Sequence, residues 1–278
     1  MRKIHKIEKT IHHDIFYPSD KDLLNKLIND TEEIYKATNK ESSKVFLIPH
    51  ASYEFILPLL VNSFTSMKDD FERILILAPS HLKNINENSN INIFVPEYET
   101  IITPLGNLNL DTEFINSYFT SSMKNATYFE EESSFEQLYI MIQHYFKDKK
   151  VVPICSIIEN STQSKNFSTF LNKLIDDKTL IIISGNASSY QKNDLSYKKA
   201  NSLIKSLESG EKLLQLQKQK IIDSCASGII DSLLKTKIYK NKSFKIQLIE
   251  VEKQISKIIT NYDIDNKCVY HITAKIKD

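Results

Sequence analysis

The sequence contains no tryptophan, only 4 glycines and only 3 cysteines among its 278 residues, and its charges nearly cancel. With 36 Lys and Arg against 35 Asp and Glu, the formal net charge is +1. That balance gives no reason to expect nucleic acid or a membrane surface as partner. No apolar run approaches the roughly 18–20 residues that a membrane-spanning helix needs. The sequence also lacks internal repeats, linkers and low-complexity tracts, so we expect residues 1–278 to form a single domain.

The cysteines and the N-terminal residues bear on the cellular compartment. Cys155, Cys225 and Cys268 are an odd number at wide spacing, which suits a reducing compartment better than a disulfide framework. The first ten residues are basic but lack the apolar run and cleavage site of a signal peptide. We therefore expect a cytoplasmic protein.

Short apolar runs alternate with segments of helical spacing along most of the chain, after a leader at residues 1–20. Such alternation predicts an α/β fold, with a mainly parallel or mixed sheet flanked by helices on both faces. Strands are expected over 45–48, 73–77, 91–95, 100–102, 151–155, 180–184, 244–251 and 268–276. Helices are expected over 23–34, 55–61, 111–123, 130–146, 163–176, 194–221 and 228–236.

Two of the expected strands share a design that ends in a histidine. The run 45–48 stops at a proline and is followed by His50, and the run 73–77 leads through a second proline to His81. Because ligands of α/β proteins bind at the carboxyl ends of strands, both histidines are candidate site residues. The alternative for each is a structural histidine that donates a hydrogen bond to a loop carbonyl.

An ordered set of short motifs spans nearly the whole chain. The motifs are F-Y-P (16–18), I-P-H-A-S-Y (48–53), A-P-S-H (78–81), T-P-L-G (103–106), E-S-S-F-E (132–136), V-V-P-I (151–154), I-S-G-N-A-S-S-Y (183–190) and S-C-A-S-G (224–228). In this order they resemble the Memo family, the AmmeMemoRadiSam system protein B, which is similar in fold to the class III extradiol dioxygenases. The resemblance implies a Memo-like domain with a site at the strand ends.

By this resemblance, His50, His81 and Cys225 match the positions at which Memo proteins place metal ligands. Two imidazoles and a thiolate suit one transition metal ion, iron or copper ahead of zinc, and leave a coordination position open. Further positions of the family pattern are expected to line a cleft: Tyr53, Ser133, Asn186, Ser189 and Tyr190.

The departures from the family pattern concern acid–base groups. Ser133 and Ser189 stand where the family has histidines, and Asn186 stands where it has an acid. Neither serine alone nor asparagine transfers protons at neutral pH, so a conventional ring-cleaving mechanism is not expected. Glu132 and Glu136 are available as carboxylates, but their spacing on an expected helix fits a solvated face equally well.

Two functions follow as hypotheses, and the sequence leaves open whether the protein is an enzyme. The first is a metalloprotein with residual redox or oxygen-dependent chemistry, linked to a radical-SAM modification system. The second is a non-catalytic protein that binds a peptide or a protein partner through the cleft of the family pattern, whose polar residues are partly replaced here. An ordinary α/β hydrolase is set aside because the sequence has no G-x-S-x-G elbow.

Overall fold

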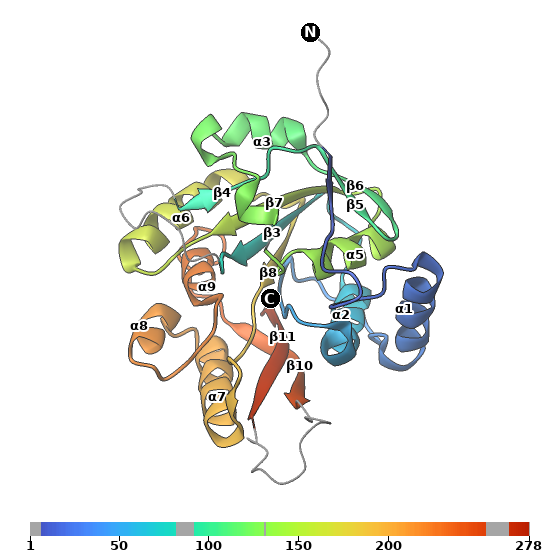
Figure 1. Cartoon of the computed structure of the whole chain (residues 1–278). Coiled ribbons are helices and arrows are strands. Elements are labelled where there is room, and N and C mark those ends of the chain that lie inside the picture. The colour runs from blue at the N-terminus through green and yellow to red at the C-terminus, as the bar shows by residue number, and fades with distance from the viewer. Residues whose placement is uncertain (1–6, 82–91, 131, 254–266, 278) are drawn as a thin grey trace.

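The computed structural model describes residues 7–81, 92–130, 132–253 and 267–277, and is built around a mixed sheet with helices on both faces (Figure 1). The strand order is β10-β11-β2-β8-β3-β7-β4, with β9 paired to β11. The strands are β2 (Val45–Ile48), β3 (Arg73–Pro79), β4 (Ile93–Phe94), β7 (Lys150–Ser156), β8 (Thr179–Ser184), β9 (Gln191–Lys192), β10 (Phe244–Lys253) and β11 (Lys267–Ile276). The α/β class and the mixed sheet predicted from the sequence are confirmed.

The centre of this sheet is parallel and its margins are antiparallel. β2, β8, β3 and β7 run side by side in the same direction, whereas β4 and β11 pair antiparallel to their neighbours. The central strands are buried almost throughout, as their apolar sequences predict. Their carboxyl ends therefore meet at one edge of the sheet, where the residues that follow each strand are close together.

Helices cover the sheet from two sides (Figure 1). One side holds α1 (Lys21–Tyr35), α2 (Tyr53–Ser66) and α5 (Glu136–Tyr145), and the other holds α6 (Ser161–Leu174), α7 (Asn193–Ser209), α8 (Leu213–Lys218) and α9 (Ser227–Leu233). The carboxylate of Asp20 accepts a hydrogen bond from Leu23 N at 2.8 Å and caps α1. Within the described ranges, no helix is both long and apolar enough to cross a membrane.

A second, three-stranded sheet involves the N-terminal segment that was expected to be a leader. It pairs β1 (Ile7–Lys9) in parallel with β5 (Thr100–Thr103), which also pairs with β6 (Gly106–Asn109). The leader prediction is therefore wrong for β1, and β6 was not predicted. The chain between this sheet and α5 forms α3 (Thr112–Tyr118), η1 (Ser121–Met123) and α4 (Thr127–Glu130).

Three helices predicted as continuous are broken in the structure. The helix expected over 111–123 ends with α3, because the backbone of Phe119 is extended. The helix expected over 194–221 divides into α7 and α8 at Gly210, whose φ of 73° is left-handed and suits glycine. The helix expected over 130–146 begins only at Glu136, so Glu132 lies in a turn. The predicted strand over 91–95 is shorter, and residue 91 lies outside the described residues.

Candidate metal centre

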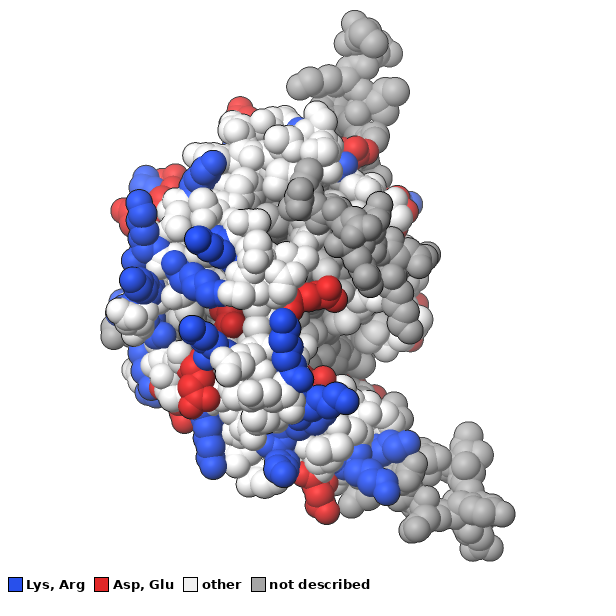
Figure 2. Space-filling view, turned by 90° about the vertical axis from the view of Figure 1, so that its left-hand side faces the viewer, with Lys and Arg blue, Asp and Glu red and all other residues white. Residues whose placement is uncertain are grey.

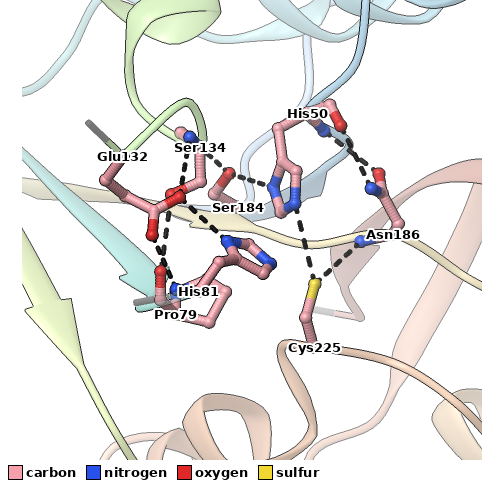
Figure 3. Close-up of polar contacts among 8 residues, drawn as sticks. All are labelled: His50, Pro79, His81, Glu132, Ser134, Ser184, Asn186 and Cys225. Carbon is pink, nitrogen blue, oxygen red and sulfur yellow. Dashed lines mark hydrogen bonds and ion pairs between the residues drawn. The ribbon is translucent and has the colours of Figure 1, made fainter. Parts of the chain in front are cut away.

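Three potential metal ligands converge at the carboxyl edge of the central strands. His50 follows β2, His81 follows β3, and Cys225 precedes α9 (Figure 3). One donor atom from each residue lies within 4.8 Å of the other two. The structure thus brings together all three residues that the family resemblance assigns as ligands, although they are far apart in the sequence.

The ring of His50 is held so that one nitrogen faces the thiol. The Ser184 hydroxyl donates to the carbonyl oxygen of Ser134 at 2.7 Å, and its oxygen lies 2.8 Å from His50 Nδ1. Because the hydroxyl proton is used by Ser134, Nδ1–H of His50 must donate to Ser184. The neutral ring then carries its lone pair on Nε2, which lies 3.8 Å from the Sγ of Cys225. This is the tautomer that a metal ligand requires.

A buried carboxylate fixes the ring of His81 with Nδ1 as the hydrogen-bond donor, as in His50. His81 Nδ1 donates to Glu132 Oε1 at 2.8 Å, and its backbone N donates to Glu132 Oε2 at 2.7 Å. The imidazole edge that carries Nε2 faces Cys225 (Figure 3). A carboxylate behind a histidine is the common outer-shell arrangement of metal sites, where it orients the ring and raises its basicity.

Cys225 reaches the histidines because two glycines allow its segment to pack closely. A Cβ atom at Gly228 would overlap the carbonyl oxygen of Ile158, and one at Gly185 would overlap the side chain of Ala226. The backbone just after the cysteine therefore approaches the segments that follow β7 and β8 more closely than other residues would allow. The thiol also accepts a hydrogen bond from Asn186 N at 3.5 Å.

The ionisable side chains of the site shift one another's pKa values. Burial raises the pKa of the Cys225 thiol, but the charge of the protonated His50 ring and hydrogen bonds from both protonated histidines outweigh burial and lower the pKa to about 6. The hydrogen bond to Cys225, together with Glu132, raises the pKa of His81 to about 10. The pKa of Glu132 is lowered, because the contact with His81 outweighs the effect of burial. In the metal-free site these shifts favour a thiolate and a protonated His81, whose Nε2 proton a bound metal ion would have to displace.

Asn186 fixes the positions of two ligands. Its Oδ1 accepts from His50 N at 3.2 Å, and its Nδ2 donates to His50 O at 3.0 Å, so the amide closes a ring with the backbone of His50 (Figure 3). His271 Nδ1 donates to the same Oδ1 at 3.2 Å from β11. A carboxylate at this position would accept but could not donate, so the amide has a use that the family's acid would not serve.

The other residues expected in a cleft lie in varied surroundings. Tyr53 is buried and its hydroxyl donates to the carbonyl oxygen of Gln137 at 2.9 Å. Ser133 is half-buried in the turn beside Glu132. Ser189 is exposed and donates to Asp223, and Tyr190 is 46% exposed with the ammonium of Lys267 over its ring. A cleft lined by these residues stays a prediction.

Sequence reasoning named Asn186 only as a cleft residue and gave neither Glu132 nor Ser184 a role in orienting the ligands. The sequence left two interpretations of Glu132 and Glu136, available carboxylates or a solvated helix face, and the second is wrong because the two side chains are only 2% and 6% exposed. The reason is local: Glu132 accepts from Ser134 N at 3.1 Å and thereby holds a turn rather than a helix. The pair of serines at 133 and 134 was the available signal, because serine favours the start of a helix over its interior.

Comparison with known proteins gives a consistent result. Residues 10–259 match the model of the family described as Memo-like protein. A MEMO1 family protein of Aquifex aeolicus is 26% identical over 197 residues, which cover 69% of this chain and 71% of the relative. A MEMO1 family protein of Methanobrevibacter smithii is 22% identical over 263 residues, which cover 87% of this chain and 92% of the relative.

Proposed function

The chain belongs to the Memo-like protein family, and on that premise we propose that His50, His81 and Cys225 bind one transition metal ion and support redox or oxygen-dependent chemistry. The observation that carries the proposal is the convergence of three donor atoms within 4.8 Å. Both histidines use Nδ1 for a hydrogen bond and keep Nε2 for the site. Two imidazoles and one thiolate form a donor set that iron, copper and zinc all accept, and the proposed redox chemistry requires iron or copper.

The surrounding residues would hold the ligands and limit the reaction type. A bound iron or copper ion would supply electron transfer and a coordination position open to a small molecule. Glu132 and Ser184 would fix the ring orientations, and Asn186 would fix the spacing between His50 and the thiol. Ser133 and Ser189 offer no acid–base group at neutral pH, which favours electron transfer over a reaction that needs a proton donor.

Metal content tests this proposal directly. Tag-free protein, reconstituted without oxygen with ferrous or cuprous ion and then desalted, should hold about one ion per chain by plasma mass spectrometry. His50→Ala, His81→Ala and Cys225→Ser should each lose the ion, because each removes one of three ligands. His13→Ala, which changes an exposed histidine, is the matched control and should keep the ion. Wild type that binds no stoichiometric metal would overturn the proposal.

Oxygen consumption tests the chemistry separately. The loaded protein should consume oxygen in the presence of ascorbate, and the ligand variants should not. If the ion binds but no oxygen is consumed and ascorbate is not oxidised, the site binds metal without the proposed redox function. The link to a radical-SAM partner rests on the family resemblance, and a co-purification experiment with such an enzyme from the same genome would test it.

A further inference from the structure

A cavity of about 330 Å³ opens beside Cys225, on the helical side of the candidate metal centre. It lies between the carboxyl ends of β3 and β7 and the helices α8 and α9. Cys225 lines this cavity and is also within reach of His50 and His81. A molecule held in the cavity would therefore lie next to the metal ligands.

The lining of the cavity combines apolar and polar side chains. Ile158, Leu214 and Ile229 contribute apolar walls. The Ser156 hydroxyl and Gln217 Oε1 are buried, and neither has a hydrogen-bond partner in the part of the chain that the structure describes. Both oxygens are covered by the surrounding protein, so the polar recognition of a ligand depends on the charged side chains of the lining.

A free cation stands at the opening of the cavity. Lys218, in the last turn of α8, is exposed and forms no hydrogen bond or ion pair with any described residue. Glu159 is the acidic residue among those that line the cavity. Lys218 has no acidic partner among the described residues, so it is available to pair with a negatively charged group of a ligand.

The positive charge extends beyond the opening. Lys218 also lines a neighbouring cavity of about 310 Å³ together with Lys212 and Lys235. The acid in that second cavity, Asp231, accepts hydrogen bonds from Leu213 N at 2.8 Å and Leu214 N at 3.1 Å, so its oxygens are already engaged. Figure 2 shows that Lys and Arg side chains outnumber acidic ones on this face, although the whole chain carries a net charge of only +1.

We infer that the cavity is the substrate pocket of the proposed function and that it takes a small organic carboxylate. The apolar body of the molecule would lie between Ile158, Leu214 and Ile229, and its carboxylate would pair with Lys218. This inference rests on the proposed function for the role of the bound molecule, but the pocket can be tested without metal.

The reactivity of Cys225 provides the test. Among the cysteines, Cys225 is half-buried and the other two are buried, so it reacts first with a disulfide reagent. Its thiolate attacks one sulfur of the reagent, the reagent's disulfide bond breaks, and the other half leaves as a light-absorbing thiolate or, after taking up a proton, as a thione while the mixed disulfide forms. Two reagents are compared at low salt: dithiobis(nitrobenzoate), whose aromatic halves carry carboxylates, and the neutral dithiodipyridine. The ratio of the two rates cancels the intrinsic reactivity of the thiol.

Reversing the charge of Lys218 should change this ratio. Lys218→Glu is expected to lower the rate with the anionic reagent about fivefold, through lost attraction and new repulsion, and to leave the rate with the neutral reagent unchanged. Lys198→Glu, on the exposed surface of α7, is the matched control and should keep the wild-type ratio. Cys225→Ser should abolish the fast reaction with both reagents.

Protection by a molecule without a disulfide completes the test. Naphthoate should slow the reaction of wild type with the neutral reagent and should protect Lys218→Glu much less, whereas naphthylmethanol should protect neither. An unchanged rate ratio in Lys218→Glu, or no protection of wild type by naphthoate, would overturn the inference. These measurements use metal-free protein, so a failure of metal binding would sink the proposed function and leave the pocket standing.

Discussion

Glu132 and Glu136 are four residues apart and both are buried, yet they stabilise different regions of the molecule. Glu136, in the first turn of α5, accepts hydrogen bonds from Ile11 N and His12 N at 2.9 Å and from the Tyr17 hydroxyl at 2.5 Å. Glu132, in the preceding turn, accepts from His81 instead. One carboxylate anchors the N-terminal segment and the other orients a candidate metal ligand. We therefore expect Glu136 to affect mainly the stability of the fold and Glu132 to affect mainly metal binding.

The largest effect should come from removing the anchor. Glu136→Ala leaves two backbone N–H groups and one hydroxyl without an acceptor, which should lower the free energy of unfolding by about 3 kcal/mol. Urea titration measures this loss, and metal content per folded chain should not change. Glu130→Ala, which truncates an exposed glutamate, should shift the free energy by no more than about 0.5 kcal/mol. A loss of metal in Glu136→Ala would remove the distinction between the two carboxylates.

The second effect separates orientation from anchoring. Glu132→Gln keeps the shape of the side chain but removes the charge behind His81, so metal affinity should fall about tenfold. Competition with a chelator of known affinity measures the change. Glu132 accepts its hydrogen bonds from His81 and Ser134 rather than from the N-terminal segment, so stability should fall less than in Glu136→Ala. Wild-type affinity in Glu132→Gln would show that the carboxylate does not support the ligand.

The smallest effect concerns a carboxylate that is only partly buried. Glu32 accepts from the Tyr145 hydroxyl at 2.7 Å and pairs with Lys36 at 3.1 Å. Burial raises the pKa of Glu32, but these two partners outweigh it and lower the pKa below its ordinary value of 4.5. A carboxyl group whose pKa is lowered in the folded state stabilises that state at pH values above its ordinary pKa. This stabilisation is lost as the pH falls through the folded-state pKa.

Glu32→Gln should therefore cost at most about 0.5 kcal/mol at neutral pH, and the difference from wild type should shrink in acid. Urea titrations of both proteins at neutral pH and well below pH 4.5 measure the difference. A difference that grew in acid would contradict the sign of the lowered pKa.

The sheet was predictable because its central strands are apolar and each ends in a clear signal. Buried parallel strands need apolar residues on both faces, so 45–48 and 180–184 stand out from the polar segments around them. Helix ends were less predictable: the break at Gly210 depends on one backbone conformation, which apolar spacing does not reveal. The three ligands followed from the family resemblance, and the strand-end rule supported only His50 and His81.

The outer shell of the site could not be predicted because it depends on contacts between distant segments. Ser184 donates a hydrogen bond to Ser134, which lies 50 residues earlier in the sequence. Asn186 donates a hydrogen bond to His50, which lies 136 residues earlier. Neither contact leaves a periodic trace in the sequence. The cavity beside Cys225 was missed for the same reason, since its walls come from two strand ends and two helices.

The close packing around Cys225 has a consequence for mutational tolerance. Gly185 and Gly228, half of the 4 glycines in the chain, are the positions where a single added carbon would push the cysteine segment away from the strands. In a saturation scan that selects for the bound metal, we expect these two positions to reject even alanine. A library that varies only the ligands would therefore underestimate how many positions the site depends on.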